Sequence, residues 1–202
     1  MELYEIPPSG NCHKIRLLLS LLHIPYTSVQ VDVANQQQKS ASFLKMNPFG
    51  QLPVLRDGET VVWDSQAILV YLARQYAPPS WLPQDAAGLS SVMAWLSTAA
   101  NEVARGPASL RVHYKFGRPI AMEDALQATE TVMQILERQL KSNDWLAGEN
   151  ITIADVAVFP YIALAPEGKI DLTLYPEICR WLRRIQALPN YVGMPLMWQN
   201  QA

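Results

Sequence analysis

The chain changes character at a proline-rich segment, Ala77-Pro78-Pro79-Ser80-Trp81-Leu82-Pro83. Before this segment, stretches with strand-like alternation of apolar residues take turns with stretches that have the apolar spacing of an amphipathic helix. After it, no stretch has a convincing strand pattern. The sequence therefore predicts an α/β domain over residues 1–77, a linker over residues 78–86 and an all-helical domain over residues 87–202.

The first domain is predicted to open with a βαβ unit. Residues 2–6 form a short strand that ends at Pro7-Pro8, and residues 26–33 alternate well enough for a second strand. Between them, the apolar residues from His13 to Leu22 follow helical spacing. Strands joined through a helix of this length pair in parallel.

A hairpin and a helix are predicted to close the first domain. Residues 53–56 and 60–63 flank Asp57-Gly58, a dipeptide that favours a tight turn between antiparallel strands. Residues 65–76 follow as a helix, and residues 40–46 form a shorter helix before the hairpin. The order βαβ-α-ββα is that of a thioredoxin-like domain.

The second domain is predicted to be a helical bundle. Apolar residues at helical spacing mark long helices over residues 89–103 and 126–140. Thr152-Ile153-Ala154-Asp155 matches a capping box, with Asp in place of the commoner Glu, ahead of an apolar helix. Pro176 opens a last helix.

Composition narrows the class of protein. Half of the 202 residues are apolar and the net charge is −2, which favours an ordered, soluble protein over one that binds nucleic acid. No apolar run approaches the ~20 residues of a membrane span, and the N-terminus has no basic leader. Cys12 and Cys179 do not make a disulfide framework, so we expect a reducing compartment, the cytoplasm.

Three motifs carry a family resemblance. Residues 47–55, Asn-Pro-Phe-Gly-Gln-Leu-Pro-Val-Leu, and residues 64–68, Asp-Ser-Gln-Ala-Ile, look like the two most specific N-terminal motifs of the cytosolic glutathione S-transferases. The box at Thr152–Asp155 looks like the C-terminal capping signature of that family. Over essentially its whole length the chain resembles the bacterial, serine-type, theta- and zeta-like members. The resemblance implies glutathione as cosubstrate, no metal, a homodimer, and detoxifying conjugation of a small, hydrophobic electrophile.

The first strand-to-helix turn is the expected thiol site. A glutathione-like thiol has a pKa roughly two units above neutral, so forming the thiolate at pH 7 requires ~2–3 kcal/mol of preferential stabilisation. A hydroxyl at the N-terminal end of a helix supplies a hydrogen bond and a favourable dipole. Ser9 is placed to do this, and the serine-type family members use a serine at this point. Capping the helix is the alternative role, and it competes for the same hydroxyl.

Two neighbours of Ser9 have open roles. The side chain of Asn11 either reaches the same sulfur, as in some bacterial transferases with disulfide-reductase activity, or only forms the turn. Cys12 stands where a Cys-x-x-Cys motif has its second cysteine, and Ser9 replaces the first. This replacement argues against dithiol chemistry. Burial against the helix is therefore favoured for Cys12 over a monothiol role.

The resemblance implies a glutathione site along the hairpin. A cis Leu52-Pro53 step turns the backbone of Leu52 outward, where it pairs with the cysteinyl backbone as an added strand. One end of the hairpin takes the γ-glutamyl group, and a lysine takes the glycyl carboxylate. The structural alternatives are a solvated loop charge for the lysine and a helix cap for the serine. The residues assigned to glutathione are Asn11, Lys39, Gln51, Leu52, Pro53, Asp64 and Ser65.

The electrophile pocket is expected between the domains, lined by the first long helix of the second domain. Aromatic and arginine side chains there favour a flat or anionic acceptor, although aromatic residues at helical spacing are more often core. His13 and His113 lack the spacing of metal ligands. The candidates for the pocket are Trp95, Arg105, Leu110, Arg111, Tyr114 and Phe116.

Two other functions are considered. The Asn11 position suggests a glutathione-dependent disulfide reductase or peroxidase on the same scaffold. A non-catalytic member whose helical domain binds a protein partner is the second alternative. The set Ser9, Lys39, Gln51, Asp64 and Ser65 argues against it.

Overall fold

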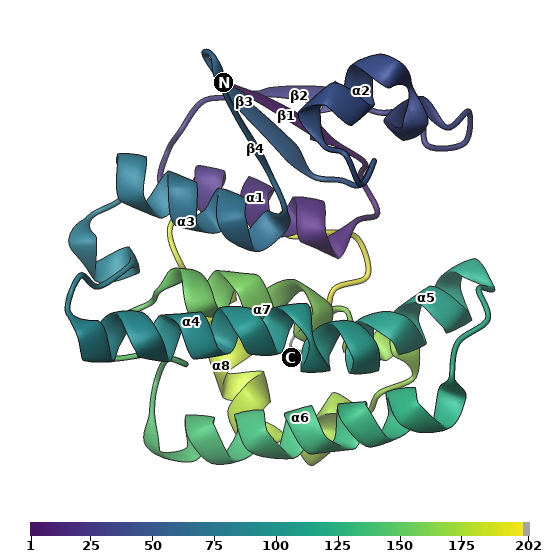
Figure 1. Ribbon diagram of the computed structural model, residues 1–202. Coiled ribbons are helices and arrows are strands. Elements are labelled where there is room, and N and C mark those ends of the chain that lie inside the picture. Colours follow the sequence, from purple (N-terminus) through teal and green to yellow (C-terminus); the bar gives the residue numbers. More distant parts are fainter. Residues whose placement is uncertain (200–202) are drawn as a thin grey trace.

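The computed structural model describes residues 1–199 (Figure 1). We call residues 1–77 the sheet half and residues 78–199 the helical half. The sheet half runs through β1 (Glu2–Glu5), α1 (Gly10–Leu21), β2 (Thr27–Gln30), α2 (Ala41–Met46), β3 (Val54–Asp57), β4 (Thr60–Trp63) and α3 (Ser65–Tyr76), with a short 3-10 turn at Gln37–Lys39.

The sheet has the strand order β2-β1-β3-β4. β1 pairs with β2 in parallel, whereas β3 pairs antiparallel with both β1 and β4, which confirms the predicted βαβ unit and hairpin. Helices α1 and α3 cover the face toward the helical half (Figure 1). On the other face, Phe43 of α2 packs with Val31 and Val54 in a small second core.

The helical half contains only helices and turns within residues 78–199. The order of elements along the chain confirms the predicted fold, an α/β thioredoxin-like part followed by an all-helical part. The elements are a 3-10 turn (Pro79–Trp81), α4 (Ala86–Ala100), a π-turn (Ala104–Ala108), α5 (Ser109–Phe116), α6 (Met122–Ser142), α7 (Ile153–Ala163), two 3-10 turns (Ala165–Gly168 and Leu172–Leu174) and α8 (Pro176–Gln186).

The helix predicted over residues 89–103 has the wrong C-terminal end, because α4 ends at Ala100. The helical path continues through the π-turn into α5, because Pro107 has no N–H for the regular ladder and widens the turn instead. A Cβ at Gly106 would lie 2.7 Å from the backbone nitrogen of Thr129, so the turn packs directly against α6.

One hydrophobic core runs through both halves. Its buried residues include Leu3, Leu55 and Leu72 of the sheet half and Phe159 and Trp181 of the helical half. At its centre, α7 contacts α1 and α3 on one side and α4 on the other (Figure 1).

The predicted capping box fixes the start of α7. The Oδ1 atom of Asp155 accepts from Leu146 N–H at 3.0 Å and from the Trp181 indole at 2.9 Å. Its Oδ2 atom accepts from Thr152 N–H at 3.0 Å, and the Thr152 hydroxyl accepts from Ala154 N–H at 3.2 Å. The box therefore joins α7, α8 and the preceding loop in one buried network.

Candidate functional site

Three loops meet at one edge of the sheet. Tyr4 pairs with Val54 and Val54 with Trp63, so β1 and β4 end where β3 begins. The turn at Ser9, the Leu52–Pro53 step and the start of α3 at Asp64 all leave the sheet at this edge. The sequence-predicted thiol and glutathione residues are thereby gathered around one corner.

Ser9 is the N-cap of α1. Its Oγ atom accepts from Cys12 N–H at 3.2 Å, and the side chain is half-buried. We expected capping and thiol binding to compete for this hydroxyl. The cap uses an oxygen lone pair, so the hydroxyl hydrogen is left to donate to a sulfur atom, and the two roles are compatible.

The next residues of the turn differ in exposure. Asn11 is half-buried in the first turn of α1, whereas Cys12 is fully buried. Burial raises the pKa of the Cys12 thiol, and the nearby Ser9 hydroxyl only partly opposes this shift. A thiolate role for Cys12 is thus disfavoured, as expected.

The Leu52–Pro53 peptide bond is cis, as the resemblance implies. Within residues 1–199, neither the N–H nor the C=O of Leu52 has a hydrogen-bond partner. The loop before it is shaped by buried Asn47, which donates to Gln51 C=O at 2.9 Å and accepts from Phe49 N–H at 3.0 Å. This geometry leaves a short backbone edge that an extended peptide can pair with.

The start of α3 presents a carboxylate and a hydroxyl. Asp64, at φ 74°, is the N-cap, and its Oδ1 atom accepts from Gln66 N–H at 2.9 Å and Ala67 N–H at 3.1 Å. The cap is therefore Asp64 and not Ser65, which corrects the alternative considered for the serine. Ser65 begins the helix and is 4% exposed, while Asp64 is exposed.

The loop residues predicted to bind glutathione are accessible. Lys39 is exposed and donates from Nζ to Phe49 C=O at 2.8 Å, and Gln51 is exposed. Lys39 is thus tied to the loop that precedes the cis step and is not a free surface charge.

The structure separates the residues expected in the electrophile pocket. Trp95 is half-buried against the main core, and Arg105 is exposed and pairs with Glu102 at 3.1 Å. Arg111 is buried, with its Nε atom 2.5 Å from Glu167. The Arg111 charge is thus paired inside the helical half, and its role in an electrophile pocket stays a prediction.

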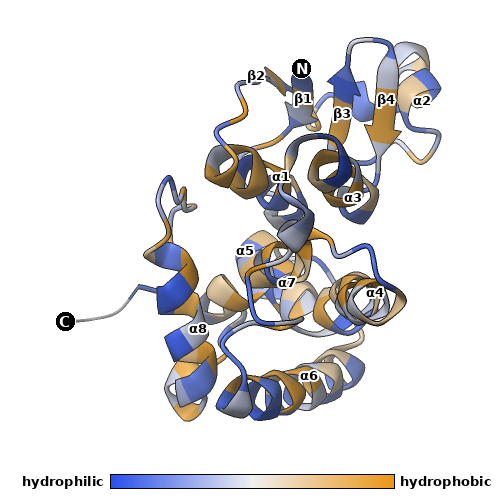
Figure 2. Cartoon of the chain, turned by 90° about the vertical axis from the view of Figure 1, so that its left-hand side faces the viewer, coloured by the Kyte–Doolittle hydropathy of each residue, from blue (hydrophilic) through white to orange (hydrophobic). Residues whose placement is uncertain are grey.

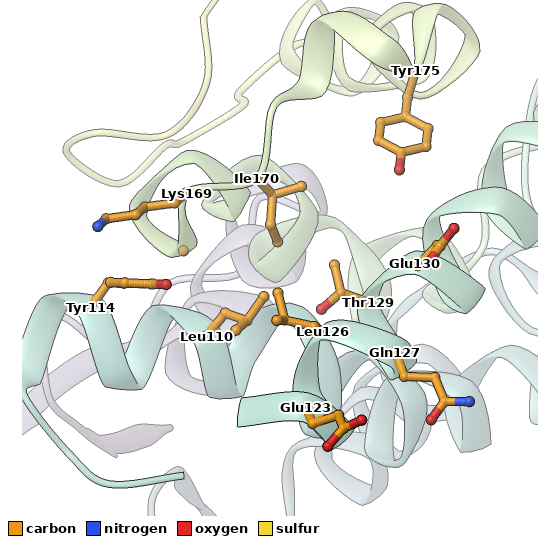
Figure 3. Close-up of a pocket in the computed structure, with 11 residues that line it drawn as sticks. Leu110, Tyr114, Glu123, Leu126, Gln127, Thr129, Glu130, Lys169, Ile170 and Tyr175 are labelled. Atoms are coloured by element: carbon orange, nitrogen blue, oxygen red, sulfur yellow. The ribbon is translucent and has the colours of Figure 1, made fainter. Parts of the chain in front are cut away.

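Leu110 and Tyr114 line a cavity of their own. They are one helical turn apart on α5 and line a cavity of about 640 Å³ with residues of α6 and the segment 168–175 (Figure 3). All of the lining residues of this cavity belong to the helical half, and a role of this pair in an electrophile pocket between the halves stays a prediction. Phe116, at the end of α5, is exposed beside the Arg111 guanidinium.

Two residues that sequence reasoning missed lie beneath the Ser9 turn. Lys14 of α1 is buried, and its Nζ atom is 5.6 Å from the centroid of the Tyr161 ring. Burial lowers the pKa of Lys14 to about 7, and Asp64 opposes this shift. Two features of the sequence could have indicated these residues: Lys14 lies among the apolar residues of its helix, and Tyr161 carries the single side-chain hydroxyl of α7.

Comparison with known proteins identifies the family. Residues 1–74 match the glutathione S-transferase N-terminal domain, and residues 108–189 match the glutathione S-transferase C-terminal domain. The chain therefore belongs to the glutathione S-transferase family and is a transferase enzyme.

Relatives and solved structures agree with this. The chain is 30% identical to glutathione S-transferase theta-1 of Bos taurus, covering 93% of this chain and 82% of that protein. It is 29% identical to the disulfide-bond oxidoreductase YfcG of Escherichia coli, covering 94% and 91%. A glutathione S-transferase structure from Pseudomonas fluorescens superimposes with a TM-score of 0.88 at 32% identity, covering 96% and 98%.

Two features are absent from the residues that the structure describes. Across residues 1–199, no helix has the length and apolar character needed to cross a bilayer. Within the same residues, no group of three or more His, Cys, Asp or Glu side chains is arranged to hold a metal ion.

Proposed function

We propose that the chain binds glutathione at the corner formed by the Ser9 turn, the cis Leu52–Pro53 step and the start of α3. The unpaired N–H and C=O of Leu52 support this site, because they suit the cysteinyl backbone of the tripeptide. Asp64 and Gln51 would meet the γ-glutamyl ammonium, Ser65 and the N-terminus of α3 the α-carboxylate, and Lys39 the glycyl carboxylate. Asn11 lines the same turn beside the sulfur.

The reaction we propose is nucleophilic substitution by the glutathione thiolate at a carbon electrophile. The thiol proton leaves to solvent, the Ser9 hydroxyl donates to the sulfur anion, and the sulfur lone pair forms the new C–S bond as the leaving group departs with its electrons. This proposal rests on the cap formed by Ser9. The Ser9 oxygen accepts from Cys12 N–H through a lone pair, so the hydroxyl hydrogen is available to donate. Helix α1 adds its positive end.

Replacing Ser9 with alanine should lower turnover with an aryl halide ten-fold or more, about 1.4 kcal/mol or greater, while glutathione affinity changes much less. Turnover falls because the Ser9 hydroxyl stabilises the thiolate. Affinity changes less because the backbone contacts of glutathione do not involve this hydroxyl. Steady-state kinetics and calorimetry with glutathione measure the two effects.

Ser40→Ala is the matched control, since Ser40 caps α2 by accepting from Phe43 N–H at 3.3 Å. It should cost about 1 kcal/mol of stability or less and leave turnover unchanged. Unchanged turnover in Ser9→Ala would transfer the thiolate role to Asn11.

Glutathione-dependent disulfide reduction is the second candidate function. It is favoured by the similarity to a disulfide-bond oxidoreductase and by Asn11 two residues after the hydroxyl. Both activities start from the same thiolate. Faster turnover of a small disulfide than of an aryl halide by the unaltered enzyme would favour reduction.

We also propose a homodimer located in the cytoplasm, with the sheet half and helical half as domains joined through residues 78–86. Two buried thiols suit a reducing compartment.

An exposed aromatic pair supports the dimer. The ring centroids of Phe49 and Trp63 are 5.3 Å apart, and the two residues are 60% and 40% exposed. Met93 on α4 is 48% exposed, and β4 and α4 lie along the same side of the molecule (Figure 2). Apolar exposure of this kind marks an interface.

Replacing Phe49 with alanine should weaken this dimer, because the substitution removes the most exposed side chain of the aromatic pair. We expect the dissociation constant to rise at least ten-fold in sedimentation equilibrium. Leu174→Ala is the control, since Leu174 is 70% exposed on a 3-10 turn of the helical half. A monomeric unaltered protein, or equal effects of both variants, would contradict the proposal.

A further inference from the structure

Helix α7 is buried along its whole length except at Tyr161, which is half-buried. The exception faces α1. A Cβ at Gly10 would lie 2.8 Å from both Cε1 and Cζ of the Tyr161 ring, so the ring is in direct contact with the first residue of α1. Gly10 directly follows Ser9. A side chain from the helical half thus supports the turn that carries the proposed thiol-binding hydroxyl.

The hydroxyl end of Tyr161 faces the N-terminus of α1. Ser9 accepts from Cys12 N–H at 3.2 Å, and the nearby Asn11 N–H partly opposes the rise in the pKa of Tyr161. The first turn of α1 is therefore capped by Ser9 and packed against the Tyr161 ring of the helical half.

The surroundings keep Tyr161 in the phenol form. Burial raises its pKa to about 12, and the titratable and charged groups that face it are Arg111, Cys12 and Lys14. Arg111 is itself paired with Glu167. The Tyr161 ring packs against Gly10.

We propose that Tyr161 is a positioning residue for the thiolate reaction, acting through the Ser9–Asn11 turn. The inference rests on the proposed function. Ser9 must hold its oxygen toward Cys12 N–H while its hydrogen points to the ligand sulfur. That orientation is defined only if the first turn of α1 keeps its place, and the Tyr161 ring packs directly against Gly10 in that turn.

Tyr161→Phe tests the hydroxyl, because the ring stays against Gly10 while the polar oxygen near the first turn of α1 is lost. We expect kcat/KM for an aryl halide to fall about three- to ten-fold. The pKa of the bound glutathione thiol, followed by ultraviolet titration, should rise by about half a unit or more. The melting temperature should change little. Tyr191→Phe is the matched control, since Tyr191 is also half-buried, and its hydroxyl contacts Met197 Sδ at 3.7 Å.

A merely structural role would change the melting temperature and leave the thiol pKa unmoved, and this result would overturn the inference. The double variant Ser9→Ala/Tyr161→Phe adds a second criterion. It should be no slower than Ser9→Ala alone, because the effect passes through Ser9. Additive losses would also overturn the inference. If Ser9→Ala itself retains full turnover, the assignment of the thiolate role to Ser9 fails as well, whereas a slow Ser9→Ala with a fully active Tyr161→Phe contradicts only the role of Tyr161.

Discussion

Replacing Asp155 with alanine is expected to lower the free energy of unfolding by about 3–5 kcal/mol. The substitution leaves Leu146 N–H, Thr152 N–H and the Trp181 indole without their acceptor, and all three residues are at most 2% exposed. Each buried, unpaired donor costs about 1–3 kcal/mol. Because burial raises the pKa of Asp155 to about 6, removing a desolvated carboxylate recovers part of this cost.

Urea unfolding at fixed protein concentration measures the loss, since a dimer makes stability depend on concentration. Asp171→Ala is the control. Asp171 also caps a helical turn, accepting from Thr173 N–H at 2.9 Å, but it is exposed. We expect Asp171→Ala to lower the free energy of unfolding much less than Asp155→Ala does. A similar loss in the two variants would show that the buried network contributes no more than an ordinary cap.

Replacing Lys14 with methionine should raise the free energy of unfolding by about 2–4 kcal/mol near pH 6.5. The folded chain buries this amine at a pKa of about 7, below the ordinary 10.5. Between these values the unfolded chain holds the proton and the folded chain does not. The stability of the unaltered protein therefore rises with pH through this window. Below pH 7 the folded state carries the full cost of the buried charge.

The advantage of Lys14→Met should thus be largest below pH 7 and should shrink by most of its value toward pH 10. Unfolding curves at pH 6.5 and 9.5 measure this difference. Lys45→Met, at an exposed lysine of α2, should show no such pH dependence. A pH-independent gain for Lys14→Met would mean that the amine is charged in the folded state throughout the range.

Short-range signals allowed much of the fold to be predicted. Asp57-Gly58 indicated the hairpin, and Thr152–Asp155 indicated the start of α7, because turns and caps depend on neighbouring residues. The π-turn at Pro107 was missed, since it depends on how closely α6 approaches Gly106. The spacing of apolar residues predicts the apolar face of a helix, but it does not predict which other element packs against that face.

The same limit applies to the candidate site. Ser9 and Asp64 stand at helix starts, which sequence patterns locate well, and their roles in binding stay predictions. The orientation of α5 is set by tertiary packing, so Arg111 is found in an ion pair with Glu167 and Tyr114 in a cavity of the helical half. Lys14 and Tyr161 come from different halves, and only the folded chain brings them together.

The shared position of α7 limits how such an enzyme can be recombined. One face of this helix contacts α1 and α3, and another contacts α4. Chimeras that join the first 77 residues of one transferase to the remainder of another would pack α1 and α3 of one protein against α7 of the other, and the side chains at this interface would not match. We expect functional exchange between relatives to require that α1, α3 and α7 be inherited as a set, so natural divergence of acceptor preference should fall mainly on helices that do not touch that interface.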